Sequence, residues 1–418
     1  NSAEDGSGIF SEESTLVLNN SLLTDNGKGI RIHGGNGTVS NSRLTSNSDS
    51  AVFINMGGEG GIVNSHISGN ERGIEVTCSE SEINVSNSTI VGNLKEGIDI
   101  DCDTVATISD SIISGNWASG ISIEGLITAV PAPIPEDFDW STVEDKCPQV
   151  VIMNSLIHTN TIYPPDSRRG GGGIMKDGCG TTIVTNTTIS GNQADLGGGI
   201  YIGDGSMTIT NSTITGNIAT HIGGGIYNSE RGENVTITGS IVSSNRDGNC
   251  SGPLASAGYN LDSGDTCGFR NAGDQINTDP IMDSRLRDNG GPTLTHQLFP
   301  RSSAIDNMEG AHCPATDQRG VERPQGAACD IGAFEVFVPA EVAGTPGIVI
   351  TDVVIYNSPE GPLEGVTPMP TSGAPTATAD QDANCRFGPE QAYMVIGYLL
   401  TNQSAPIVGR NTDSSWWV

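Results

Sequence analysis

Aromatic and basic residues are scarce in this sequence, and both shortages limit what the protein can be. Aromatic residues make up 5% of the 418 residues, and 19 Lys and Arg stand against 49 Asp and Glu, a formal net charge of −30. So large a negative charge repels nucleic acids and anionic membrane surfaces. We therefore expect no nucleic-acid partner, whereas cations and a solvated extracellular surface are compatible with the charge.

Long apolar runs are absent as well. Because no stretch of about 20 apolar residues occurs, the sequence predicts no direct membrane span. The chain opens with Asn1 and Ser2 instead of Met, and its last segment ends before a complete domain, so we expect it to be a fragment at both ends.

The nine cysteines form no C-x-x-C motif, which argues against zinc ribbons and thioredoxin-like redox sites. Neighbours in the sequence suggest four disulfides: Cys78–Cys102, Cys147–Cys179, Cys250–Cys267 and Cys313–Cys329. This pattern predicts an oxidising, extracytoplasmic location, secreted or on the cell surface. Cys385 is left over, with a partner expected beyond the end of the chain, and a set of buried free thiols is the alternative.

Glycine is abundant, with 56 residues, and it accompanies an internal repeat. The phrase N-S-x-I-x-x-N, with some variation, begins at residues 20, 41, 64, 87, 110, 154, 186, 211 and 239. The fourth letter of the phrase is aliphatic, and so is the residue two places before its first letter. The last letter is Asn, and a following segment, G-I-x-I or similar, contributes a third aliphatic residue. The copy at Asn211, for example, carries Ile209, Ile214, Asn217 and Ile226.

Each copy predicts three short strands with inward aliphatic side chains, separated by Asn, Ser and Gly turns. Heptads are absent, which excludes a helical solenoid. Three strands in about 23 residues are typical of a parallel β-helix, in which each coil pairs with the coils above and below. At about 4.8 Å per coil, nine coils would stack to roughly 45 Å, and the Asn column could form an amide ladder along the axis.

These repeats resemble the right-handed parallel β-helix family, the pectin-lyase-like fold, over about residues 6–270. The resemblance implies an all-β chain whose residues 1–270 form a right-handed parallel β-helix with three strands per coil and nine or more coils. Two Pro-containing insertions, at 126–148 and 161–170, are expected on the surface, where solenoids carry binding loops.

The segment after the repeats resembles the choice-of-anchor Q domain of bacterial secreted and surface proteins. The motifs DNGGPTLTH, SAID, DQRG, RP and CDIGAFE occur in this order between residues 288 and 335. The resemblance implies export and surface display but no reaction. We expect 271–338 to cap the last coil, with its Asp, Arg and His side chains making structural hydrogen bonds.

Two further segments follow the cap. Residues 339–383 form a linker rich in Pro, Thr and Gly, with one good strand at 347–356 that could pack on the rod or join a neighbouring molecule. Residues 384–418 are similar to bacterial SH3-like domains in the motifs R-x-G-P, Y-x-V-I-G and G-R-x(5)-W-W-V, and this copy is truncated.

Catalytic signatures are missing. The D-D, G-H-G and R-I-K motifs of pectin-lyase-like hydrolases do not occur, and basic residues for a lyase are few. No H-x-H, H-E-x-x-H or G-x-S-x-G motif occurs among the six histidines and the serines. We therefore predict no catalytic residues and no enzyme activity.

One acidic stretch is a candidate cation site. EGIDIDCDT (96–104) alternates, which predicts Asp99, Asp101 and Asp103 on one outward face, with Glu75 one coil away in the Asp99 column and Glu124 one coil away in the Asp101 column. Such a density of carboxylates suits calcium, the one candidate cofactor, although the EF-hand and G-G-x-G-x-D patterns are absent. A solvated acidic face and a catalytic role are the alternatives.

Three aromatic residues, Phe53, Tyr201 and Tyr227, are predicted in the same outward column and could stack on sugar rings or pack beneath a loop. These features favour a non-catalytic exported surface protein, an adhesive or structural β-helix rod of the bacterial envelope or extracellular matrix. It could self-associate or bind other surface proteins. The alternative is a polysaccharide-binding or polysaccharide-cleaving protein that uses an outward face.

Overall fold

A computed structural model describes residues 6–77, 80–125, 147–162 and 170–336, together with six short strands between residues 376 and 417. The chain divides into two units, residues 1–287 with 291–337 and residues 288–290 with 338–418. Within the described residues no helix is long and apolar enough to cross a membrane.

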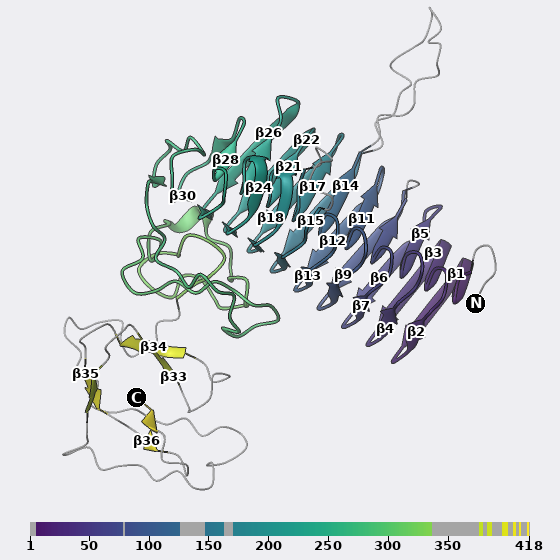
Figure 1. The fold of residues 1–418 in the computed structure, drawn as a ribbon, viewed down its shortest axis with the longest axis horizontal. Helices are drawn as coiled ribbons and strands as arrows, with labels where there is room; N and C mark the ends of the chain where they lie inside the picture. Colours follow the sequence, from purple (N-terminus) through teal and green to yellow (C-terminus); the bar gives the residue numbers. More distant parts are fainter. Residues whose placement is uncertain are drawn as a thin grey trace, which may run out of the picture. The chain divides into compact units, whose positions relative to one another are not determined.

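The first unit is the predicted parallel β-helix, a stack of coils in sequence order (Figure 1). Its first strands are β1 (Ile9–Asn19) and β3 (Ile30–Ser40), which pair in parallel and run through two faces of their coils. The strands that continue the first face are β5 (Val52–Asn55), β8 (Ile74–Val76), β11 (Ile98–Asp101), β14 (Ile121–Glu124), β17 (Ile174–Asp177), β21 (Ile200–Ile202), β25 (Ile226–Asn228) and β28 (Cys250–Ser251).

The second face continues from the ends of β1 and β3 in the same 18-stranded sheet. Its strands are β6 (Glu59–Val63), β9 (Glu82–Ser86), β12 (Val105–Ser109), β15 (Gln149–Met153), β18 (Thr181–Thr185), β22 (Gly205–Thr210), β26 (Gly232–Thr238) and β29 (Ala255–Ser256).

The third face is a separate 11-stranded sheet. It consists of β2 (Leu22–Thr24), β4 (Arg43–Thr45), β7 (His66–Ser68), β10 (Thr89–Val91), β13 (Ile112–Ser114), β16 (Leu156–His158), β19 (Thr188–Ser190), β23 (Thr213–Thr215), β27 (Ile241–Ser243), β30 (Leu261–Asp262) and β31 (Gln275–Ile276). The stack therefore continues past the last recognised copy of the phrase, because β30 and β31 follow it without the N-S letters.

The lumen is lined by the predicted aliphatic columns. In the copy at Asn211, Ile209, Ile214 and Ile226 are fully buried, and nearly all equivalent residues of the other coils are buried as well. Leu18 in the first coil is only partly buried, since β1 has one neighbouring strand. Burying this apolar surface contributes about 25 cal/mol per Å².

An asparagine ladder runs beside the lumen, as predicted. In each step the backbone N–H and the side-chain Nδ2 of one Asn donate to Oδ1 of the next Asn of the ladder, over 2.9–3.1 Å and 2.7–3.1 Å. The acceptor lies in the next coil in every step but the last, in which Asn245 donates to Asn249 four residues later. The ladder comprises Asn26, Asn47, Asn70, Asn93, Asn116, Asn160, Asn192, Asn217, Asn245 and Asn249.

The other two polar letters of the phrase have separate roles. The Ser in the second position accepts a backbone N–H from the preceding coil, as Ser88 Oγ does from Ser65. The first position adopts a positive φ in all nine copies, from Asn20 to Gly239. Asn, Asp and Gly are the residues that adopt this conformation most readily, so the first letter closes the corner between two faces.

Three of the four predicted disulfides are present: Cys147–Cys179, Cys250–Cys267 and Cys313–Cys329. Cys102 is also disulfide-bonded, whereas its predicted partner Cys78 lies outside the described residues. These bridges overturn the alternative of free thiols for the described pairs and suggest an extracellular protein.

The segment after the coils lies along their side. It was predicted as a cap on the last coil, but it packs on the outer face of the third sheet, where Thr188 Oγ1 donates to Gln318 Oε1 over 2.6 Å and Asn186 Nδ2 donates to the Thr316 carbonyl over 2.7 Å. A second apolar cluster, which includes Ile241, Leu298 and Phe334, fills the interface.

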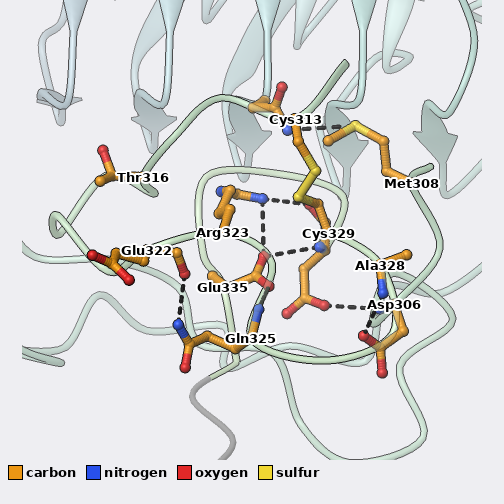
Figure 2. The surroundings of a disulfide bond; sticks show 12 residues. Asp306, Met308, Cys313, Thr316, Glu322, Arg323, Gln325, Ala328, Cys329 and Glu335 are labelled. Carbon is orange, nitrogen blue, oxygen red and sulfur yellow. Dashed lines mark hydrogen bonds and ion pairs between the residues drawn. A yellow bond between two sulfur atoms is a disulfide. The ribbon is translucent and has the colours of Figure 1, made fainter. Parts of the chain in front are cut away.

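Some charged residues of this segment, among them Arg323 and Glu335, are buried in its own interior (Figure 2). Arg323 donates to the carbonyls of Asp330 and Gly332 and forms an ion pair with Glu335 at 3.2 Å, next to the Cys313–Cys329 bridge. Glu335 also accepts the backbone N–H of Gln325 over 2.8 Å. These contacts agree with a structural role for the polar residues of the segment.

The second unit contains three antiparallel strand pairs among its described strands. They are β32 (Thr376–Thr378) with β35 (Ser404–Pro406), β33 (Ala383–Arg386) with β34 (Val395–Leu399), and β36 (Gly409–Arg410) with β37 (Trp416–Trp417). The predicted strand at 347–356 lies outside the described residues.

The ladder yields a stability prediction. In Asn93→Ala the backbone N–H of Asn70 loses its buried acceptor, and residue 93 no longer donates Nδ2 to Asn116. A buried donor without a partner costs about 1–3 kcal/mol, so we expect a loss of roughly 2–4 kcal/mol in the free energy of unfolding, measured by chemical denaturation.

The matched control is Asn64→Ala, which removes an exposed ladder on the outside of the coils, where Asn87 Nδ2 donates to Asn64 Oδ1 over 2.7 Å. Here only the positive φ of residue 64 opposes alanine, at about 1 kcal/mol. Equal losses in the two variants would show that the inner ladder adds nothing to the fold.

Candidate functional site

One continuous row of outward side chains crosses the first face of the β-helix. The strand register places one residue per coil in this row and leaves no coil out between β1 and β28. We call it the outward row; it consists of Phe10, Arg31, Phe53, Glu75, Asp99, Ser122, Met175, Tyr201, Tyr227 and Ser251. The predicted column of Phe53, Tyr201 and Tyr227 is confirmed.

The first part of the outward row combines rings with cations. The Arg31 guanidinium carbon lies 5.4 Å from the centre of the Phe10 ring and 5.6 Å from that of Phe53. Lys28 Nζ lies 4.7 Å from the Phe53 ring and also pairs with Asp49. A cation over an aromatic face is stabilised by the ring quadrupole, so these side chains hold one another in an ordered patch.

The middle of the outward row is acidic. The register confirms Glu75 opposite Asp99, and in a second row, two residues further along each strand, Asp101 opposite Glu124. This second row continues to Asp177, which the sequence did not single out. The carboxylates therefore form two parallel rows on neighbouring coils.

A basic residue that sequence reasoning missed lies among these acids. Arg72 Nε is 3.0 Å from Glu96 Oε2 and 3.2 Å from Asp99 Oδ2. Glu75 in turn accepts a hydrogen bond from Ser50 Oγ. A sequence signal for Arg72 existed, because Arg72 precedes the buried Gly73-Ile74 step just as Glu96 precedes Gly97-Ile98 one coil later.

Burial and crowding change the acidity of two carboxyls. Burial raises the pKa of Asp99 to about 7, helped by the neighbouring Glu96 and Asp101 and opposed by Arg72. Burial also raises the pKa of Asp101 to about 6, with Glu124 and Glu75 as the next causes. Both groups hold a proton well above the usual range of aspartate, and Asp99 can donate a hydrogen bond near neutral pH.

The predicted place of Asp103 is wrong. Strand β11 ends at Asp101, and Cys102 turns the chain with a φ of +46°. Alternation therefore stops, and Asp103 does not extend the two acidic rows as the period of two suggested. Among the described residues no group of three or more His, Cys, Asp or Glu side chains is arranged to hold a metal ion, and calcium remains a prediction.

The last part of the outward row is a stacked pair of tyrosines. The Tyr201 and Tyr227 rings lie 5.6 Å apart at an angle of 13°. Burial raises the pKa of Tyr201, and the nearby Asp177 carboxylate raises it further. Gly203 makes this proximity possible, because a Cβ there would lie 2.4 Å from Asp177 Oδ1 and 2.9 Å from Tyr201 Cε1.

Comparison with known proteins addresses the fold. The sequence model of the family described as "Right handed beta helix region" matches residues 1–126 and 142–272. Among solved structures, a crystal structure of pectate lyase Pel9A is similar, with a TM-score of 0.47 and 17% identity over 74% of this chain and 73% of that one. No curated protein matches the sequence.

The raised pKa of Asp99 predicts a pH-dependent stability. The pKa of Asp99 is about 7 in the folded protein and 3.8 in the unfolded chain. Its protonated carboxyl therefore stabilises the fold fully below pH 3.8, and this stabilisation is lost as the pH rises through about 7. The amide of the variant Asp99→Asn does not titrate. The stability of this variant relative to the native protein should therefore rise between pH 5 and pH 8.

The measurement is the midpoint of thermal unfolding of both proteins at several pH values in that range. Asp49→Asn is the control, because pairing with Lys28 and a backbone hydrogen bond outweigh burial and leave the pKa of Asp49 lowered. Its stability relative to the native protein should fall or stay level over the same range. A constant difference for Asp99→Asn would contradict the assignment.

Proposed function

Since the chain belongs to the right-handed β-helix family, we propose that it is a non-catalytic, exported surface rod that binds a polysaccharide along the outward row. The single observation that carries the proposal is the unbroken register from Phe10 to Tyr227. Eight steps of about 4.8 Å give a line of side chains roughly 40 Å long.

The chemistry of the outward row suits a chain of sugars. Aromatic rings lie on both sides of its acidic middle, Phe53 on one side and the Tyr201–Tyr227 stack on the other, and aromatic side chains can contact sugar rings. Between them lie carboxyls, which can accept hydrogen bonds and, when protonated, donate them to hydroxyl groups. A repeating ligand fits a repeating row better than a compact one, because the coils of the row, apart from that of the buried Ser122, present side chains at the same spacing.

Adhesion or a structural role fits the rest of the chain. Disulfides support an extracellular, secreted or surface location. In this proposal residues 271–338 act as a choice-of-anchor Q-type segment of a bacterial surface protein and 384–418 as an SH3-like module, as their motifs suggest. The rod could also self-associate or bind other surface proteins, which the mass of the protein in solution tests.

Polysaccharide cleavage is a second candidate, favoured by one observation. Asp99 and Asp101 project on the same face of β11, and burial and neighbouring carboxylates raise the pKa of both. Glycosidases use a pair of carboxyls, one of them protonated to act as the general acid. The two candidates differ in whether new reducing ends appear when the protein meets a polysaccharide.

The test of binding is a glycan-array screen followed by affinity measurement with the best ligand. Tyr201→Ala should weaken binding roughly fivefold, since a stacked aromatic contact contributes about 1 kcal/mol. Trp117→Ala is the control: Trp117 is 60% exposed but lies outside the outward row, so its loss should leave affinity unchanged.

Two results would contradict the proposal. One is the absence of binding to any glycan by the native protein, with and without calcium. The other is release of reducing ends by the native protein that Asp99→Asn abolishes, which would establish the cleaving enzyme instead.

A further inference from the structure

Lys176 lies in the lumen, in a column that is otherwise aliphatic around it. In the register of β17 it is paired with Ile123 on one side and Ile202 on the other, and all three side chains are fully buried. Removing an ammonium group from water costs several kcal/mol unless hydrogen bonds compensate. The lysine therefore needs acceptors inside the coil.

Two of its acceptors belong to the turn that follows β17. Lys176 Nζ donates to the carbonyl of Gly178 over 2.5 Å and to that of Cys179 over 2.6 Å. The turn has a positive φ at Gly178 and Gly180, and Cys179 is also bridged to Cys147. The ammonium thus fixes the turn from the lumen side.

The same turn controls Asp177. The backbone N–H of Gly178 donates to Asp177 Oδ1 over 3.0 Å, so the carboxylate takes its direction from the first residue of the turn. Gly203 leaves the space in which this carboxylate and the edge of the Tyr201 ring come together. A chain of contacts accordingly leads from the lumen to the outward row.

We propose that Lys176 is a positioning residue: by holding the 178–180 turn from inside, it keeps the Asp177 carboxylate beside Tyr201 and so shapes the tyrosine end of the outward row. The consequence for sugar binding rests on the proposed function. The geometric part does not, because it concerns only how Asp177 and Tyr201 lie.

The experiment uses Lys176→Met in the full chain. Methionine suits an aliphatic column, and replacement of a buried charge by an apolar side chain is often neutral or stabilising, so the midpoint of unfolding should stay level or rise. Freed from its turn, Asp177 should leave Tyr201, and the pKa of Tyr201 should fall toward its ordinary value. This pKa is measured by ultraviolet titration, with Tyr201→Phe to identify the signal.

Affinity for the glycan found in the screen should fall about threefold in Lys176→Met and by a similar factor in Asp177→Asn, less than in Tyr201→Ala, because the ring is displaced and not removed. The control Ile67→Met places methionine in the lumen beneath the third sheet, away from the 178–180 turn, and should change neither the affinity nor the titration of Tyr201.

A Lys176→Met protein with native Tyr201 titration and native affinity would overturn the proposal. If the native protein binds no glycan, the proposed function fails, while the titration still decides the role of Lys176. Should Lys176→Met fail to fold, Lys176→Arg replaces it: a guanidinium can serve the same carbonyls, and a shifted Tyr201 titration in that folded variant would equally overturn the proposal.

Discussion

The inner asparagine ladder is the constraint on which the rest of the structure depends. Each Asn satisfies two donors of the preceding coil with one oxygen, and it does so in a buried position, where a donor without a partner would be costly. A coil that shifted by one residue would lose both bonds and turn its aliphatic side chains toward water. The ladder thereby locks the register, and a locked register is what assembles residues that are distant in the chain, such as Glu75, Asp99 and Ser122, into one outward row.

This dependence explains why so much of the fold could be predicted. Lumen and ladder positions allow few residue types, so the copies at Asn41 and Asn211 carry nearly the same letters although they begin 170 positions apart. The aliphatic columns and the ladder follow from that uniformity, whereas the three disulfides join cysteines that are neighbours in the sequence. Outward residues vary freely, yet their places in the rows were also predictable. The buried residues beside Phe53 and Tyr201 fix the register of their strands, and the register places both rings in one row.

What could not be predicted lies where a local interaction overrides the repeat. Asp103 fails because Cys102 adopts a positive φ and ends the strand, and a period of two carries no information about such a turn. Lys176 keeps its inward place in the repeat, but the repeat gives no sign that a lysine can be buried there, because its acceptors come from the 178–180 turn. The side-on packing of the segment after the coils depends on contacts such as Thr188 with Gln318, 130 residues apart, for which the sequence has no periodic signal.

A stacked fold also sets the electrostatics of any surface it presents. Two carboxylates in the same row on adjacent coils are held about 4.8 Å apart, where their repulsion at an effective dielectric constant near 20 amounts to about 3 kcal/mol. Two features of this acidic surface relieve the repulsion: Arg72 pairs with Glu96 and Asp99, and the pKa is raised to about 7 for Asp99 in the outward row and to about 6 for Asp101 in the second row. The formal charge of the chain therefore overstates the negative charge that a ligand meets at this face. An uncharged polysaccharide can approach it as a surface of rings and hydrogen-bonding groups, whereas the same carboxyls fully ionised would demand cations.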